Sequence, residues 1–265
     1  MRDNILDINA DMGESFGNWS MGRDAELMPL ITTANMACGF HASDPQIMGD
    51  RVAEASRLQV AVGAHPGLPD LMGFGRRRMS ITAKEARAYV LYQVGALKAF
   101  LDVNQEPLHH IKPHGALYLM INEEESIARA VMQAVSELQT NPLYYWPAPI
   151  PAGVVRAADH YGVQLVPEFY VDTRYDDEGG LILQRVKTAA SVPLAVETAR
   201  RFVLDGYIES AGGKKLVFDA DSLCIHGDGP NCVEVVSAVR ECLASEGVVF
   251  AAAERQDERT AVVSP

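Results

Sequence analysis

The sequence of 265 residues contains few cysteines and no long apolar run. Its cysteines, Cys38, Cys224, Cys232 and Cys242, show no CxxC spacing, so we expect reduced thiols in the cytoplasm rather than a disulfide framework. No apolar signal segment opens the sequence, and no window approaches the length of a membrane span. We therefore expect no membrane partner.

Basic residues are outnumbered as well. The 23 lysines and arginines against 35 acidic residues give a net charge of −12, which argues against a nucleic-acid groove as the main binding surface. An anionic small substrate is not excluded, because a single local Lys or Arg is enough to bind it. Neither Gly73–Arg78 nor Gly206–Lys215 has the spacing of a phosphate-binding loop. We therefore expect no nucleotide site on this chain.

What is present is an alternation of short apolar runs with helical patterns. A hydrophobic content of 48% with 22% charged residues is ordinary for a globular protein. Alternation of this kind predicts a mostly parallel sheet with helical crossovers. The predicted strands are Ile5–Ile8, Val60–Val62, Leu108–Ile111, Val163–Val166, Ser222–Ile225 and Val248–Phe250.

Helices are predicted where apolar residues recur on one face. Such faces are Val90, Val94, Leu97 and Leu101; Ile127, Val131, Ala134 and Leu138; and Cys232, Val236, Val239 and Leu243. Asp44-Pro45 is typical of a helix start, and Thr82–Glu85 has the spacing of a capping box.

No linker divides the chain, so we predict one domain over residues 1–250 and a polar C-terminal tail over 251–265. Pro142–Pro151 holds four prolines and is interpreted as a loop or an irregular crossover. Asp172–Gly180 is acidic and contains glycine, which favours a loop beside a site.

Polar motifs follow several of the apolar runs. They are Asp7–Glu14, Asn35–Pro45, Gly63–Gly67, His110–Tyr118 and Cys224–Asp228. In a β/α barrel all strand ends meet at one face, whereas in an open sheet only the strands at the switch point share a crevice. The number of these motifs therefore favours a barrel with one active-site mouth.

The first motif carries two carboxylates, Asp11 and Glu14, three residues apart. Two carboxylates in one pocket can act as general base and general acid. A carboxylate at such a position can also cap a helix or pair with an arginine. Asn9 beside them supports a functional role, while Asp7, within the strand, is interpreted as structural.

Imidazole and ammonium groups follow the later strands. The catalytic candidates among them are His41, His65, Lys112 and His114. A lysine near a strand end, such as Lys112, can hold a substrate carboxylate or a developing oxyanion. Asn9, Asn35, Arg76, His226 and Asp228 are the predicted substrate-binding residues. Each of these residues also has a non-functional interpretation. The histidines can simply be hydrogen-bonded within the fold, Lys112 can lie in solvent, and the arginines at 76–78 can form a solvated patch. His109 and His110 are interpreted as structural.

The sequence leaves open whether this chain binds a metal ion. Asp11, His41 and His65 are suitable ligands for zinc or a similar ion. The HxxxH and HExxH spacings that mark many zinc sites are missing, so the sequence gives no ligand set.

Six stretches together resemble the LamB/YcsF family. They are DINADMGESFGNW (7–19), ITTANMACGFHASDP (31–45), VGAHPGLPDLMGFGRR (62–77), YQVGAL (92–97), KPHGALY (112–118) and CIHGDGP (224–230). The resemblance implies a β/α barrel of the glycoside hydrolase/deacetylase type, which can have seven strands.

The implied activity is the ATP-dependent opening of the lactam of 5-oxoproline to glutamate. The resemblance also implies a 5-oxoprolinase complex with partner B and C subunits, and ATP and magnesium bound on those partners. Two alternatives are kept open. One is a metal-dependent deacetylase or amidohydrolase on the same barrel, and the other is a non-catalytic subunit that scaffolds a partner enzyme.

Overall fold

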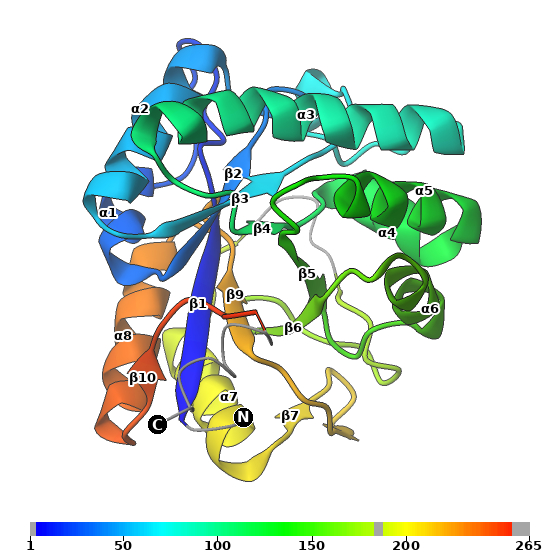
Figure 1. Cartoon of the computed structure of the whole chain (residues 1–265). Coiled ribbons are helices and arrows are strands. Elements are labelled where there is room, and N and C mark those ends of the chain that lie inside the picture. The colour runs from blue at the N-terminus through cyan, green and yellow to red at the C-terminus, as the bar shows by residue number, and fades with distance from the viewer. Residues whose placement is uncertain (1–3, 183–187, 256–265) are drawn as a thin grey trace, which may run out of the picture.

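Seven parallel strands close into a barrel surrounded by helices in the computed structural model, which describes residues 4–182 and 188–255 (Figure 1). The strands follow the order β1-β2-β3-β4-β5-β6-β9, and β9 pairs back with β1 through Asp7 and Ser222. The predicted β/α barrel is confirmed, with seven strands. The barrel strands are β1 (Ile5–Met12), β2 (Thr33–Ala37), β3 (Ala61–His65), β4 (His110–Ile111), β5 (Leu143–Pro147), β6 (Leu165–Tyr170) and β9 (Ser222–Ile225).

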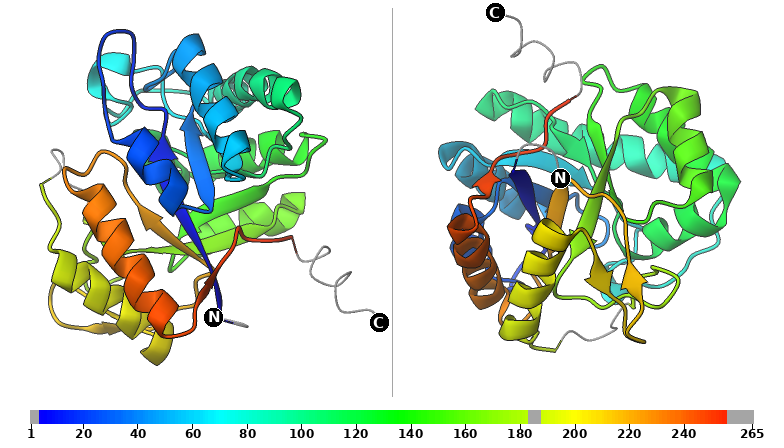
Figure 2. Two further views of the ribbon diagram at one scale, coloured as in Figure 1. Left: turned by 90° about the vertical axis from the view of Figure 1, so that its left-hand side faces the viewer. Right: turned by 90° about the horizontal axis from the view of Figure 1, so that it is seen from below.

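Helices cover the outside of the barrel, as the two further views show (Figure 2). They are α1 (Asp24–Leu27), η1 (Met28–Leu30), α2 (Pro45–Arg57), η2 (Leu71–Gly73), α3 (Ala83–Asn104), α4 (Gly115–Glu123), α5 (Glu125–Ser136), α6 (Ala152–Tyr161), α7 (Val192–Asp205) and α8 (Cys232–Ser245). A short hairpin of β7 (Ile208–Glu209) and β8 (Lys215–Leu216) lies beside α7, and β10 (Val249–Phe250) pairs with the start of β1. Within the described ranges, no helix has the length and apolarity to cross a membrane.

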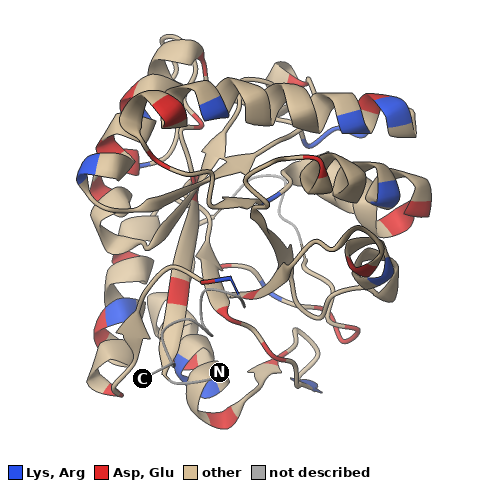
Figure 3. Cartoon of the chain, in the orientation of Figure 1, with Lys and Arg blue, Asp and Glu red and all other residues tan. Residues whose placement is uncertain are grey.

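The helix starts and faces follow local chemistry. The side chain of Asp44 accepts hydrogen bonds from the first backbone N–H groups of α2, and Thr82 with Glu85 forms the predicted capping box of α3. The α3 face with Val90, Val94, Leu97 and Leu101 is fully buried. Charged residues lie mainly on the helices and loops and are sparse on the barrel strands (Figure 3).

One predicted loop is in fact a barrel strand. The segment Pro142–Pro151 contains β5, in which Tyr144, Tyr145 and Trp146 are fully buried. Bulky aromatic residues favour strands, and proline is tolerated at a strand end, where Pro147 lies. The loop interpretation was wrong because it gave the four prolines more weight than the aromatic run between them.

The segment after β10 does not leave the barrel at once. The backbone N–H of Ala251 donates to the carbonyl of Leu6, and the carbonyl of Ala253 accepts from His109 at 2.9 Å. The rest of the predicted tail, 256–265, lies outside the described residues.

The base of the barrel is held together by Asp7. Its carboxyl group accepts hydrogen bonds from the hydroxyl groups of Thr32 (2.5 Å), Thr33 (2.9 Å), Tyr145 (3.0 Å) and Ser222. Burial raises the pKa of Asp7, and the Ser222 and Thr32 hydroxyl groups partly oppose that rise. These hydrogen bonds connect β1 to β5 and to the starts of β2 and β9. This agrees with the structural role predicted for Asp7.

We expect Asp7→Ala to lower the free energy of unfolding by about 3–5 kcal/mol. The substitution leaves several buried hydroxyl groups without their acceptor, and each such loss costs about 1–3 kcal/mol. Urea denaturation followed by circular dichroism measures the change. Asp50→Ala, on the exposed side of α2, is the matched control and should leave the midpoint unchanged. An Asp7→Ala midpoint equal to that of the control would contradict this role.

Candidate active site at the barrel mouth

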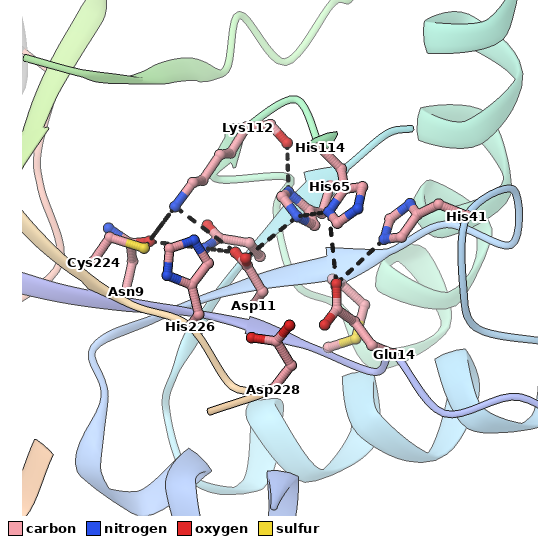
Figure 4. A network of polar contacts seen from close by, with 12 residues as sticks. Asn9, Asp11, Glu14, His41, His65, Lys112, His114, Cys224, His226 and Asp228 are labelled. Atoms are coloured by element: carbon pink, nitrogen blue, oxygen red, sulfur yellow. Dashed lines mark hydrogen bonds and ion pairs between the residues drawn. The ribbon is translucent and has the colours of Figure 1, made fainter. Parts of the chain in front are cut away.

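The polar motifs predicted from the sequence meet at the carboxyl ends of the barrel strands, around a cavity of about 900 Å³. Its walls include the predicted residues Asp11, His65, Arg76, Lys112, His114 and His226. Glu14 and His41 lie just behind this wall, in contact with each other and close to His114 (Figure 4). The structure therefore brings together the candidates from five separate stretches of the chain.

Lys112 is the centre of a buried polar network. Its Nζ lies 3.1 Å from Glu168 Oε2, 3.0 Å from Asn9 Oδ1 and 2.8 Å from Cys224 Sγ, and it is 3.7 Å from Asp11 Oδ1. Burial opposes the charged form, but Cys224, Glu168 and Asp11 outweigh it and raise the pKa of Lys112. Lys112 is therefore a fixed, permanently charged ammonium group in the floor of the cavity.

The surroundings of Asp11 and Glu14 shift their pKa values in opposite directions. Burial raises the pKa of Asp11, but nearby positive charge, including that of Lys112, outweighs burial and brings the pKa well below its usual range. Burial, followed by the nearby charges of Asp11 and Asp228, raises the pKa of Glu14 well above its usual range. Two carboxyl groups with diverging pKa values are the arrangement in which one serves as base and the other as acid.

Asn9 and Asn35 lie beneath the cavity and are absent from its wall. The amide of Asn35 donates to Asp11 Oδ1 (2.9 Å) and to Asn9 Oδ1 (2.8 Å), and its oxygen accepts from His110 Nε2 at 2.7 Å. Asn9 in turn donates to Glu168 at 2.9 Å. With their amide groups engaged by protein partners, we interpret both as positioning residues for Asp11 and Lys112, in place of the substrate contact predicted from the sequence.

Three imidazoles pack together on the other side of Asp11. His41 stacks on His114 with ring centroids 3.8 Å apart, and His65 Nε2 lies 2.9 Å from His114 Nδ1. Burial lowers the pKa of all three rings, that of His65 to about 3, so each is neutral. Gly75, with φ +62°, makes room for them, because a Cβ there would lie 2.6 Å from the Cβ of His41.

Glu14 Oε1 completes this group, 3.4 Å from His41 Nε2 and 3.7 Å from His114 Nδ1. One ligand-type atom from each of Glu14, His41, His65 and His114 lies within 4.8 Å of the others. Glu14 and His114 join His41 and His65 in this set, whereas Asp11 lies outside it, between His65 Nε2 (3.6 Å) and Lys112 Nζ (3.7 Å). The structure thus groups residues that no sequence spacing could have grouped, since they follow four different strands.

The rim of the cavity carries two further pairs. Arg76 donates to Asp228 at 2.7 Å and lies over the ring of Phe74, while Arg77 and Arg78 pair with other carboxylates at the surface. His226 uses Nδ1 to bind Asp172 at 3.0 Å. All three arginines line the cavity, and Asp172 of the predicted Asp172–Gly180 loop contacts His226 beside it. The substrate-binding role of Arg76 stays a prediction.

Sequence reasoning missed the partners of the predicted residues. Glu168, Cys224 and His110 are fully buried and hold Lys112 or Asn35. From the sequence, Cys224 was expected to be a reduced thiol, and His110 was interpreted as structural. The signal for Glu168 was a carboxylate in the middle of an otherwise apolar strand segment, which needs a buried partner.

We expect Lys112→Ala to destabilise the fold by about 3–5 kcal/mol, because it leaves the fully buried Glu168 without its cation. The urea midpoint measures the effect. Lys84→Ala, at an exposed position of α3, is the control and should change little. If both variants unfold at the same urea concentration, Glu168 does not depend on Lys112.

Comparison with known proteins adds to this geometry. The model of the LamB/YcsF family matches residues 6–258. The chain is 41% identical over 246 residues to the 5-oxoprolinase A subunit of Staphylococcus epidermidis, covering 92% of this chain and 96% of that protein. The 5-oxoprolinase A subunit of Pyrococcus furiosus is 42% identical over 246 residues, with coverage of 92% and 95%.

Solved structures give a consistent picture. The lactam utilization protein from Thermus thermophilus superposes with a TM-score of 0.86 at 41% identity, covering 94% of this chain and 99% of that one. The catalytic domain of a peptidoglycan N-acetylglucosamine deacetylase from Eubacterium rectale has a TM-score of 0.51 at 9% identity, covering 95% and 89%. The second likeness concerns the fold alone.

Proposed function

The chain belongs to the LamB/YcsF family, and on this premise we propose that it is the A subunit of an ATP-dependent 5-oxoprolinase. The reaction would open the lactam of 5-oxoproline to L-glutamate with ATP and the partner B and C subunits. The observation that carries the proposal is the similarity over nearly the full length to relatives that are named as the A subunit of 5-oxoprolinase. The name of the Thermus structure, a lactam utilization protein, supports a cyclic amide as the substrate class.

The geometry of the mouth supports hydrolysis of an amide. Ring opening adds water to the carbonyl carbon and breaks the C–N bond, so it needs a base for the water and a proton for the departing nitrogen. Asp11 is ionised and faces the cavity, which suits it as the base. His226 is oriented by Asp172 through Nδ1, which leaves Nε2 available to carry a proton.

Charge at the mouth supports an anionic substrate. Lys112 keeps its positive charge next to Asp11. In this position it can stabilise the negative charge that develops on the carbonyl oxygen of the substrate lactam when water is added. Arg76 lies at the rim with its guanidinium partly exposed, and we propose that it binds the substrate carboxylate, with Asp228 as its partner until the substrate binds. ATP would act on the partner subunits, since this sequence has no phosphate-binding loop.

One observation favours a second function. The cluster of Glu14, His41, His65 and His114 is of the kind that metal-dependent amidohydrolases or deacetylases use. Such an enzyme would hydrolyse its amide substrate without ATP, which distinguishes the two proposed functions.

We also propose a cytoplasmic location, which the free state of Cys38, Cys224, Cys232 and Cys242 supports.

The test is reconstitution. The purified chain, mixed with the B and C subunits, should release glutamate from 5-oxoproline with matched formation of ADP. Omitting this chain should stop both products. If the B and C subunits form glutamate at the same rate without it, the chain is not part of the catalyst.

A further inference from the structure

The hydrogen bonds of His65 and His114 fix which nitrogen of each ring carries the proton. His65 Nδ1 lies 2.7 Å from the backbone carbonyl of Lys112, and His114 Nε2 lies 2.8 Å from that of Phe74. A carbonyl oxygen can only accept, so both of these nitrogens are donors. A neutral imidazole has a single N–H, and it is used up by the carbonyl in each ring.

The two remaining nitrogens therefore both present lone pairs, and they face each other. His65 Nε2 and His114 Nδ1 are 2.9 Å apart. Two lone pairs at this distance repel unless a positive centre lies against both. Histidines whose second nitrogen is held by a backbone carbonyl are the usual arrangement around a bound metal ion, because the carbonyl fixes the tautomer and the ring direction.

Glu14 and His41 supply the other sides of the same space. Glu14 Oε1 and His41 Nε2 lie 3.4 Å apart, and the four ligand-type atoms fall within 4.8 Å of one another (Figure 4). Bond lengths of about 2.0–2.2 Å to a tetrahedral zinc ion place ligand atoms about 3.3–3.6 Å apart. The separations of 2.9 Å (His65 Nε2 to His114 Nδ1), 3.4 Å (Glu14 Oε1 to His41 Nε2) and 3.7 Å (Glu14 Oε1 to His114 Nδ1) lie on both sides of this range. The widest separation, up to 4.8 Å, exceeds it, so a bound ion would draw these side chains together.

His41 presents its Nε2 to the same space, and its ring is fully buried. The ring is held by stacking on His114, which directs Nε2 toward Glu14. That orientation is explained if Nε2 binds a cation.

We propose that Glu14, His41, His65 and His114 form a binding site for one divalent transition-metal ion of the zinc type. Three imidazoles and one carboxylate favour Zn²⁺ or Co²⁺ over Mg²⁺ and Ca²⁺, which prefer all-oxygen sites. The site lies next to Asp11, which joins it to the Lys112 network through contacts of 3.6 Å to His65 Nε2 and 3.7 Å to Lys112 Nζ. It goes beyond the proposed lactam chemistry, because binding of the ion can be measured whether or not the chain is a 5-oxoprolinase.

The experiment is a metal titration of the intact purified chain after treatment with a chelator. Calorimetry with Zn²⁺ should show one saturable equivalent, and Co²⁺ should give the visible absorption of a bound, low-symmetry ion. Zn²⁺ should also raise the melting temperature, because it binds only the folded state. Glu14→Gln and His114→Asn should each weaken Zn²⁺ binding by at least about tenfold, since even outer partners of a metal contribute about 10–100-fold.

The controls distinguish a metal site from a structural cluster. His160→Asn removes an exposed histidine on α6 and should leave the Zn²⁺ affinity unchanged. Glu14→Gln keeps the size of the side chain, so it reports on binding even if His114→Asn does not fold. Absence of saturable Zn²⁺ and Co²⁺ binding would overturn the proposal and indicate that His65 and His114 share a proton. Equal Zn²⁺ affinity in wild-type and Glu14→Gln chains would also overturn it.

Discussion

Asp11→Asn should leave the barrel folded and reduce glutamate release by the reconstituted complex by about 10²–10⁴-fold, the contribution typical of a positioned acid–base group. The amide can keep its oxygen toward Asn35 and Lys112, which Asp11 Oδ1 now contacts at 2.9 Å and 3.7 Å. Its NH₂ group then faces His65 Nε2, where Asp11 Oδ2 now lies 3.6 Å away. The contacts are retained while the basic oxygen is lost.

The measurement is the initial rate of glutamate formation at saturating 5-oxoproline and ATP, together with a thermal melt of each variant. Glu14→Gln belongs in the same series, because the diverging pKa values of the two carboxyl groups assign the base role to Asp11. Asp50→Asn on the surface of α2 controls for the loss of one negative charge. A folded Asp11→Asn variant with the rate of this control would remove Asp11 from the mechanism.

The isolated chain should release no measurable glutamate from 5-oxoproline, even with ATP and magnesium. The lactam is a resonance-stabilised amide, and we propose that ATP activates it on the partner subunits. The sequence of this chain has no phosphate-binding loop of its own. Calorimetry with a non-hydrolysable ATP analogue should accordingly show no binding to the chain alone, whereas addition of the B and C subunits should start turnover.

The same experiment distinguishes the two proposed functions. Turnover by the chain alone that depends on added ATP would reveal a nucleotide site that the sequence does not indicate. Amide hydrolysis by the chain alone without ATP, with Zn²⁺ present, would favour the metal-dependent amidohydrolase. Activity of the complex that is unchanged by Asp11→Asn would instead favour a scaffolding role for this chain.

The sequence by itself determined the class of fold and the main candidates of the site. Strand and helix periods are local properties, and in a barrel every strand ends at the same face, so polar residues after separate strands could be assigned to one pocket. This is why Asp11, His65, Lys112 and His226 could be assigned to one mouth, whose wall they line, while His41, assigned with them, lies just behind that wall. Helix starts at Asp44 and Thr82 were also readable, because capping depends on neighbours within three residues.

Only the tertiary structure decided which group each candidate faces. Glu168 and Cys224 reach Lys112 from β6 and β9, and Asn35 is turned toward Asp11 by its neighbours in the barrel. The distance between such residues depends on barrel closure and strand register, which local patterns do not contain. The lone pairs of His65 and His114 likewise face each other because two backbone carbonyls, of Lys112 and Phe74, take up the other nitrogens. Spacing along the chain cannot encode that choice, since it is made by backbone atoms that become neighbours only when the barrel closes.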